Sequence, residues 1–433
     1  MKRVMFVAMV GLFAAGWMTT VQKLGENPAN YKRLVAEAQK YDGEELYVRA
    51  IENYKAALEY QPDNKEIQVS IAKNYLAVGD ESAYTSRMNS VIESNDYPVS
   101  EVSMLADYYI EKGRNESAIN LLQKALKRHP KEEELLSRYG KVRYTYNNLY
   151  VSAQEIGQIV NGCAVYMDND QYGIMSASGK AMIRAGKEWC APYSSDGKLA
   201  PVKENGQIYL ADKSGYRYEI PAEGDQVETM GLINNDVAPA KINGVYGYVN
   251  SKFEKLSEFA WDDATQINDG LGAVKKGEKW AILDKKFQVI SDYVYDDVAV
   301  DENGFFCVNS RAFVKQAGGY QMINEKGEMV GAETYEDAKP FVSDQPAAVK
   351  KNGKWGFVDH AGAWVIEPQY QDAGSFSGGF APVQTASGWG YINQNNELVI
   401  ADEFSAAKNF QNGIAPVQDG NHWTMIELNV KNQ

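Results

Sequence analysis

The chain has 433 residues, a formal net charge of −14 at pH 7, 24% charged residues and 44% hydrophobic residues. This composition fits a globular protein of two or three domains and excludes a chain that is disordered throughout. The negative net charge argues against nucleic-acid binding. A chain with three His residues has few side chains for histidine catalysis or for a His-rich metal site. Cys163, Cys190 and Cys307 have no metal-ligand spacing, so we expect them to be small buried residues, with one disulfide in an exported chain as the alternative. We expect no cofactor.

The first 25 residues are predicted to be a targeting segment outside the fold. Lys2 and Arg3 precede an apolar run that extends to residue 18 and, less strictly, to residue 21. Residues 4–21 would span about 27 Å as a helix, close to the ~30 Å hydrocarbon core of a bilayer. We predict a signal anchor with its N-terminus in the cytoplasm and the bulk of the chain outside. A cleaved signal peptide followed by secretion is the alternative.

Residues 27–150 repeat with a period of 34. Small Ala residues recur where two helices would cross closely, aromatic residues fill the adjacent gaps, and Pro ends the second helix of each pair. The set Ala38, Tyr41, Ala50, Tyr54, Ala57 and Pro62 recurs 68 residues later as Ala106, Tyr109, Ala118, Leu122, Ala125 and Pro130. A degenerate copy lies between them, with Asp96 in place of the Pro.

These offsets resemble those of tetratricopeptide repeats. The resemblance implies stacked helix pairs with a concave surface that binds peptides or neighbouring subunits. Residues 131–150 would form a capping helix that covers the last apolar face. A rigid spacer without a partner is the alternative for this segment.

A second repeat, of eight units, occupies residues 151–433. Each unit has an apolar element, a turn with dipeptides such as Asn-Gly, a second element that begins with an aromatic residue, and two further short apolar stretches. The first elements end at Val165, Val202, Ala240, Val274, Val308, Val349, Val383 and Val417, and the second elements begin at Tyr172, Ile208, Tyr246, Trp280, Tyr320, Trp355, Trp389 and Trp423. The spacing is six or seven except in the fifth unit, where we place six extra residues between Asn309 and Gly319.

The Trp-Gly pairs at Trp355-Gly356 and Trp389-Gly390 resemble the WG repeats of bacterial proteins. The resemblance implies blades of a β-propeller, and four short strands in about 35 residues is the size of one blade. We therefore predict an α+β multidomain protein: an all-α helical-repeat solenoid followed by an all-β propeller. Eight blades are expected, with seven blades and an extra hairpin as the alternative. The last unit ends about one strand short, so residues near 149–153 are expected to close the ring.

Two sets of charged residues follow the blade register. Asp263, Asp297, Asp337 and Asp372 recur at one position, which predicts a structural role in accepting backbone N–H groups at a turn. A carboxylate ring that binds a cation or a basic peptide, and a catalytic set, are the alternatives. Lys203, Lys241, Lys275 and Lys350 directly follow the landmark residues, as solubilising charges or as a basic arc that binds an anionic polymer. The irregular fifth unit adds Arg311 and Lys315 as candidate partner-binding residues, because irregular loops on rigid scaffolds often carry function.

The sequence contains no nucleophile elbow, phosphate-binding loop, HExxH or CxxC motif. We therefore predict a non-catalytic, membrane-anchored, extracytoplasmic interaction or scaffold protein that binds a protein, a peptide or an envelope glycan, and no nucleic acid. A propeller-type enzyme acting on cell-surface glycan is the alternative. The carboxylates outside the repeat register, Asp225, Glu228 and Asp301, would be its candidate acids.

Overall fold

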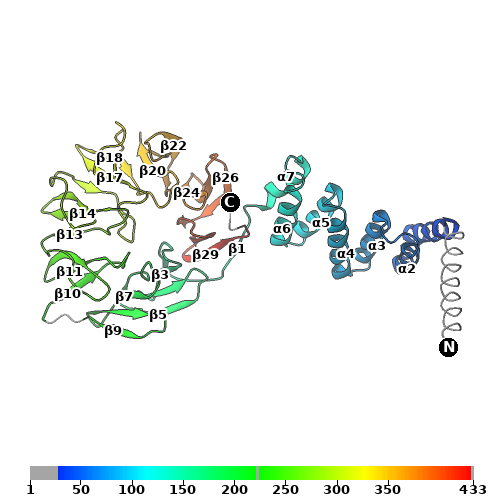
Figure 1. The fold of residues 1–433 in the computed structure, drawn as a ribbon, viewed down its shortest axis with the longest axis horizontal. Coiled ribbons are helices and arrows are strands. Elements are labelled where there is room, and N and C mark those ends of the chain that lie inside the picture. Colours follow the sequence, from blue (N-terminus) through cyan, green and yellow to red (C-terminus); the bar gives the residue numbers. More distant parts are fainter. Residues whose placement is uncertain (1–27, 221–223, 431–433) are drawn as a thin grey trace, which may run out of the picture. The chain divides into compact units, whose positions relative to one another are not determined.

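The computed structural model describes residues 28–220 and 224–430. The chain divides into two compact units, one up to Arg143 and one from Tyr144 onward. In the described ranges the first unit contains seven helices, and the second contains strands β1–β29 arranged as a ring of eight sheets (Figure 1). The predicted fold class, a helical region followed by an eight-bladed propeller, is confirmed.

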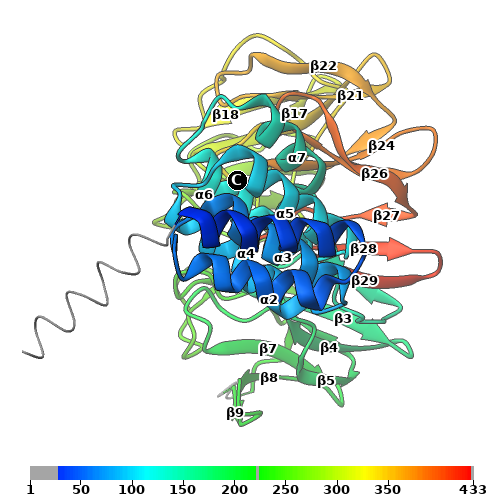
Figure 2. The same cartoon turned by 90° about the vertical axis from the view of Figure 1, so that its right-hand side faces the viewer.

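The helices follow one another as antiparallel pairs, and Figure 2 views the array along its length. Ala50, Ala57, Ala106, Ala118 and Ala125 are fully buried, as expected where two helices cross closely. A helix that includes residues 28–43 precedes α2 (Tyr47–Leu58), α3 (Lys65–Ala77), α4 (Glu81–Ser94), α5 (Val99–Glu111), α6 (Asn115–Leu126) and α7 (Glu133–Val142).

Side chains at helix starts define the turns of this array. The Asn64 side chain accepts the backbone N–H of Ile67 at 3.0 Å, and Asp80 accepts that of Ala83 at 2.9 Å, so both helices have N-caps. The degenerate middle repeat ends without the usual proline. Asp96 and Tyr97 take left-handed φ values of 55° and 58° there and reverse the chain before α5.

Each blade is an antiparallel sheet whose first strand in chain order is short. Blade 1 comprises β2 (Glu155–Ile156), β3 (Cys163–Asp168), β4 (Gln171–Ser176) and β5 (Ala181–Lys187); blade 2, β6 (Trp189–Cys190), β7 (Leu199–Glu204), β8 (Gln207–Asp212) and β9 (Arg217–Glu219); blade 3, β10 (Val227–Met230), β11 (Ala238–Ile242) and β12 (Val245–Val249); and blade 4, β13 (Asp263–Ala264), β14 (Leu271–Lys276) and β15 (Lys279–Asp284). Blade 5 comprises β16 (Asp297–Val298), β17 (Arg311–Gln316) and β18 (Gly319–Asn324); blade 6, β19 (Asp337–Ala338), β20 (Ala347–Lys351), β21 (Lys354–Val358) and β22 (Trp364–Tyr370); blade 7, β23 (Asp372–Ala373), β24 (Phe380–Gln384), β25 (Trp389–Asn393) and β26 (Leu398–Phe404); and blade 8, β27 (Ala406–Ala407), β28 (Ile414–Asp419), β29 (His422–Leu428) and β1 (Tyr146–Asn148).

The ring is closed by β1, which comes from the start of the unit and pairs with β29, the last strand. Tyr146 lies opposite Leu428, and the pairing continues where the N–H of Leu149 donates to the carbonyl of Met425 at 2.9 Å. The closing strand therefore lies directly before the residues near 149–153 that were expected to supply it. The ladder itself begins a few residues earlier, at Tyr146.

The glycine of the Trp-Gly pair makes room for an irregular fourth strand. In β4·β5, β21·β22 and β25·β26 the register shifts at this glycine. A Cβ on Gly173, Gly356 or Gly390 would lie 2.5–2.6 Å from a carbonyl oxygen of the fourth strand. Where the fourth strand pairs with β8 without a shift, the position holds Tyr209. The repeat signature is thus a steric consequence of the bulge.

The predicted register of the fifth unit was wrong. Lys315 lies opposite Tyr320, so Val314 rather than Val308 is the landmark residue and the hairpin is of ordinary length. The extra residues instead precede β17. Twelve residues, 299–310, connect β16 to β17, whereas six residues make the same connection in blade 4. We call residues 299–310 the inserted loop.

In residues 28–220 and 224–430 no helix is long and apolar enough to cross a membrane. This finding contradicts the predicted localisation as a single-pass membrane protein. The apolar run at residues 4–21, on which that prediction depended, lies outside the residues that the structure describes.

Candidate functional site

The inserted loop reaches from blade 5 to blades on the other side of the ring. The Glu302 carboxylate accepts the backbone N–H of Gln158 in blade 1 and forms an ion pair with Lys408 in blade 8. The carbonyl of Gly304 accepts the N–H of Gln266, which follows β13 in blade 4, at 2.8 Å. The loop is therefore fixed at three blades besides its own.

A buried carboxylate holds the turn of this loop. Asp301 accepts the backbone N–H groups of Asn303 and Phe305, both at 2.9 Å. Gly304 takes a φ of +83°, and its N–H donates to the carbonyl of Asp301 at 3.0 Å. Burial raises the pKa of Asp301 to about 6, because the charged form loses its hydration.

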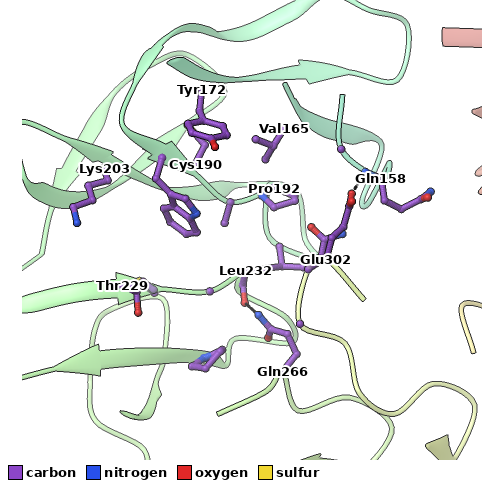
Figure 3. Close-up of a pocket in the computed structure, with 18 of the residues that line it drawn as sticks. Gln158, Val165, Tyr172, Cys190, Pro192, Lys203, Thr229, Leu232, Gln266 and Glu302 are labelled. Carbon is purple, nitrogen blue, oxygen red and sulfur yellow. Dashed lines mark hydrogen bonds between the residues drawn. The ribbon is translucent and has the colours of Figure 1, made fainter. Parts of the chain in front are cut away.

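A cavity of about 730 Å³ lies between the inserted loop and blades 1–4 (Figure 3). Four carboxylates and one lysine line it, together with aromatic rings. These residues are Glu155, Glu188, Glu228, Glu302 and Lys203, with Tyr172, Trp189 and Tyr246. A smaller cavity of about 280 Å³ is lined by the other side of the loop, by Gln158 of blade 1 and by blades 6–8. We call these two the larger and the smaller cavity; a hollow of about 900 Å³ in blades 2 and 3 lies apart from both. The inserted loop therefore separates the two cavities from each other.

Two side-chain amides among the residues that line the larger cavity each have one atom without a hydrogen-bond partner within the described protein. Gln266 is 1% exposed, and its Nε2 donates to the carbonyl of Leu232 at 2.8 Å, whereas its Oε1 accepts nothing (Figure 3). The Nδ2 of Asn303 is also buried without an acceptor. Both atoms are buried behind the surface of the cavity, so the two residues line it through their other atoms.

The cavity arises at one position of the repeat. In each blade the residue after the first strand donates its N–H to a carbonyl of the second strand, which establishes the equivalence of Gly157, Ala191, Gly231, Thr265, Ala299, Lys339, Gly374 and Lys408. In blades 6 and 8 this residue is a lysine. In blades 1–3 it is Gly157, Ala191 and Gly231, all of which line the cavity. Because Gly and Ala have no side chain or a short one, they leave empty the volume that a lysine side chain occupies in blades 6 and 8.

The two lysines at this position have similar surroundings. Lys339 Nζ lies 2.7 Å from Asp372 Oδ1 and 4.8 Å from the centre of the Trp355 ring. Lys408 Nζ pairs with Glu302 and lies 5.4 Å from the centre of the Trp423 ring. An ammonium group between a carboxylate and an aromatic face is a favourable arrangement.

The predicted basic residues do not form one free arc. Each of three lysines lies in a ladder between an Asp on the first strand and an aromatic residue on the third. These sets are Asp263, Lys275 and Trp280; Asp297, Lys315 and Tyr320; and Asp337, Lys350 and Trp355. Because directly opposed residues share a face of the sheet, the carboxylates offset the lysine charges.

The other predicted basic residues also have partners. Lys241 pairs with Glu228 at 3.6 Å, and Arg311 donates to the carbonyl of His360 at 2.7 Å. Lys203 lines the larger cavity, and its Nζ lies 3.4 Å from the carbonyl of Glu228. Of the six predicted basic residues, Lys203 alone lines that cavity.

The repeated aspartates have the structural role that their repetition predicts. Asp263, Asp297, Asp337 and Asp372 each accept the N–H of the following residue at 2.7–2.9 Å. The off-register Asp225 pairs with Lys255 at 2.8 Å, and one oxygen of Glu228 accepts the N–H of Gly244 at 2.6 Å. In the described ranges no group of three or more His, Cys, Asp or Glu side chains is arranged to hold a metal ion.

A family model described as WG containing repeat matches residues 246–280, 322–355, 355–386 and 389–423. The chain therefore contains WG repeats, as the Trp-Gly pairs predicted. The tetratricopeptide resemblance of the helical unit stays a prediction. A comparison with curated proteins found no match.

Solved structures with similar folds have low sequence identity. A eukaryotic initiation factor is 11% identical, with 67% of this chain and 89% of that chain covered and a TM-score of 0.43. Hsv2 of Kluyveromyces lactis is 9% identical, with 64% and 99% covered and a TM-score of 0.35. The first TPR of Spaghetti (RPAP3), bound to the HSP90 peptide SRMEEVD, is 18% identical, with 26% and 90% covered and a TM-score of 0.23. At these scores none of the three supports a conclusion about function.

Proposed function

We propose that this chain is a non-catalytic interaction protein whose propeller binds a segment of a partner protein in the larger cavity. The cavity of about 730 Å³ carries this proposal, because carboxylates, a lysine and aromatic rings from four blades line it together with the inserted loop. A volume of this order suits a bound side chain and its flanking backbone. The helical pairs of the first unit offer a second surface for protein contacts.

Features of the cavity favour binding over catalysis. Glu188 and Glu228 each accept the N–H of a hairpin glycine, Gly206 at 2.9 Å and Gly244 at 2.6 Å, so both carboxylates stabilise turns. Burial raises the pKa of the Cys190 thiol to about 12, which leaves it protonated and unreactive at neutral pH. Asp301, with its raised pKa, lines the smaller cavity and accepts two backbone N–H groups.

The test is affinity capture with a variant that fills the cavity. Ala191→Met places a long neutral side chain at a lining position, and Asn395→Met makes a similar change at an exposed position of blade 7. We expect the full chain and Asn395→Met to retain one stoichiometric protein partner from native extract, and Ala191→Met to lose it. Equal capture by both variants, with unchanged circular dichroism, would refute cavity binding. Turnover of a glycan by the purified chain would refute the non-catalytic assignment.

A further inference from the structure

We propose that the hollow of about 900 Å³ in blades 2 and 3 is a second binding site, whose ligand is a neutral oligosaccharide of β-1,4-linked sugar rings. A volume of this size is within the range of about 300–1,000 Å³ that is usual for small-ligand sites. The inference does not depend on the proposed function, because the hollow and the larger cavity share no lining residue. It goes beyond that function by adding a ligand of a different class.

The hollow is formed by a turn that is longer than its equivalents in the repeat. The turn between the first and second strands of blade 3 bridges Asn234 to Val237, and blades 1, 4, 5, 7 and 8 have the same spacing. In blade 2 the N–H of Ser194 donates to the carbonyl of Leu199 at 2.7 Å, so this turn has two more residues. The enclosed residues, 195–198, all line the hollow. Irregular loops on a rigid scaffold are frequent places for binding.

Hydrogen bonds hold the long turn against blade 3. The N–H of Ser195 donates to the carbonyl of Ile233 at 3.0 Å, and the Oγ of Ser195 accepts the N–H of Asn235 at 2.9 Å. The Oδ1 of Asp236 accepts the N–H of Ser251 at 2.9 Å, which joins a third segment of the lining to the same place. A ligand would therefore meet a surface that is already formed, and binding would not have to order it.

An exposed tyrosine lines the hollow, and a second one packs against it. Tyr218 lies opposite Leu210 in the β8·β9 ladder, and Leu210 packs in the core between blades 2 and 3. Because directly opposed residues share a face of the sheet, Tyr218 is on the face of blade 2 that is turned toward blade 3. Tyr218 is 46% exposed, and the ring of Tyr216, which is 62% exposed, meets it edge-on with 4.7 Å between ring centres. A tyrosine with an apolar ring and a polar hydroxyl suits contact with the C–H face of a sugar ring.

The polar groups that remain available in the hollow are a mixture of donors and acceptors. Within the described residues no hydrogen bond or ion pair engages the Lys213 ammonium, the Asn235 amide or the Ser251 hydroxyl. In the same part of the chain the Oδ2 of Asp236 has no hydrogen-bond donor either. A sugar hydroxyl can both donate and accept hydrogen bonds, so it can pair with groups of either kind.

The charges of the hollow favour a neutral ligand. Lys198 is paired with Asp196 at 2.9 Å. The remaining ammonium, that of Lys213, shares the lining with the carboxylates of Asp212 and Asp236. An anionic ligand would meet these carboxylates as well as the ammonium and would lose part of the attraction. In a β-1,4-linked glucose chain every ring substituent is equatorial, so each ring presents a flat C–H face to an aromatic side chain.

The test is isothermal titration calorimetry of the full chain with cellotetraose, a neutral β-1,4-linked glucose oligomer. Maltotetraose has the same rings in α-linkage and does not present them as one flat ribbon, and tetragalacturonate carries a carboxylate on each ring. We expect cellotetraose to bind about tenfold more tightly than either of the other two oligosaccharides. We also expect the chain to leave cellotetraose uncleaved.

Variants assign the binding to the hollow. Tyr218→Ala removes the aromatic face and is expected to weaken cellotetraose binding about tenfold, whereas Tyr218→Phe keeps the ring and is expected to retain most of the affinity. Tyr150→Ala changes a tyrosine that is 92% exposed and outside the hollow, and is expected to leave the affinity unchanged.

A second pair of variants removes an amide at a position where glycine is tolerated. Asn235 has a φ of +49°, which glycine adopts freely, so Asn235→Gly keeps the turn. Its expected loss is about fivefold, which corresponds to one hydrogen bond. Asn412→Gly makes the same change in the equivalent turn of blade 8, at a φ of +50°, and is expected to have no effect on binding. This pair provides the test if Tyr218→Ala does not fold.

Each unfavourable outcome overturns a defined part of the inference. Equal affinities of Asn235→Gly and Asn412→Gly, together with equal affinities of Tyr218→Ala and Tyr150→Ala, would overturn the assigned site. Tighter binding of tetragalacturonate would overturn the neutral ligand, and no binding of any of the three oligosaccharides would overturn the inference as a whole. Ala191→Met, which fills the larger cavity, is expected to bind cellotetraose as the parent does. Loss of binding in that variant would place the sugar in the larger cavity, whereas loss of the captured partner alone leaves the two sites independent.

Discussion

Gly390→Ala tests the steric explanation of the WG repeat. A Cβ at this position would lie 2.6 Å from the carbonyl oxygen of Ile400 and 2.8 Å from the backbone nitrogen of Asp402, against 3.4 Å or more for ordinary contact. The fourth strand of blade 7 must then move by about 0.8 Å. Forced overpacking of this kind costs about 1–3 kcal/mol, and the lower entropy of the unfolded chain with Ala returns about 0.4–1 kcal/mol. We expect a net destabilisation of about 1–2 kcal/mol.

The matched variant is Ala281→Gly, at the equivalent position of blade 4. Ala281 is paired with Val274 of β14 on one side, but on the other side, where a fourth strand would lie, no residue is paired opposite it, and the side chain is fully buried. If glycine after the aromatic residue stabilised every blade, Ala281→Gly would stabilise the protein. The structure predicts the opposite, a loss of about 1 kcal/mol, because the unfolded chain gains freedom and a packed methyl group disappears. Urea unfolding followed by tryptophan fluorescence measures both variants. A stabilised Ala281→Gly or a neutral Gly390→Ala would refute the steric explanation.

Three further predictions concern ring closure and the inserted loop. Asn147→Pro removes a ladder hydrogen bond of β1 and leaves its acceptor unpaired, so we expect a loss of about 1–3 kcal/mol in urea unfolding, and an unchanged midpoint would contradict closure by this strand. The pKa of Asp301, about 6 in the folded chain and about 3.9 in an unfolded one, means that the stability it contributes is present below about pH 4 and is lost as the pH rises through 6. Asp301→Asn stays neutral and keeps an acceptor oxygen, so it should exceed the parent in stability by about 3 kcal/mol at pH 8 and by little at pH 4; parallel pH profiles would contradict this. Glu302→Gln leaves the Lys408 ammonium, whose side chain is 17% exposed, without its carboxylate, so hydrogen exchange in residues 299–310 should accelerate several-fold, and unchanged protection would show that the ion pair does not hold the loop.

Much of the architecture could be predicted from the sequence, because the same packing requirement in each repeat selects the same type of residue at the same position. Helix crossings require small side chains, which gave the period of 34, and blade hairpins require landmark apolar and aromatic residues, which gave the eight units. The repeated aspartates were correctly interpreted as structural for the same reason. A residue that recurs at one position serves the repeat itself.

The cavity could not be predicted, because departures from the repeat create it. Gly157, Ala191 and Gly231 are unremarkable in sequence, and only the hydrogen-bond equivalence with Lys339 and Lys408 shows that a side chain is missing there. The inserted loop was placed in the wrong connection because Val308 and Val314 both fit an apolar landmark. Strand pairing alone decides between them. Glu302, which joins blade 5 to blades 1 and 8, carried no signal in the sequence beyond its place in an irregular unit.

Closure of the ring by β1 also sets an order for folding during synthesis. Asn147 in β1 and its hydrogen-bond partner Asn429 are separated by 282 residues. At about 5–20 residues per second, a ribosome needs roughly a quarter of a minute to a full minute to make this length of chain. Throughout that time β1 has no strand to pair with, and the growing series of blades ends in an exposed edge that can pair with another chain. The nascent chain is therefore open to strand exchange between neighbouring ribosomes until its last blade emerges.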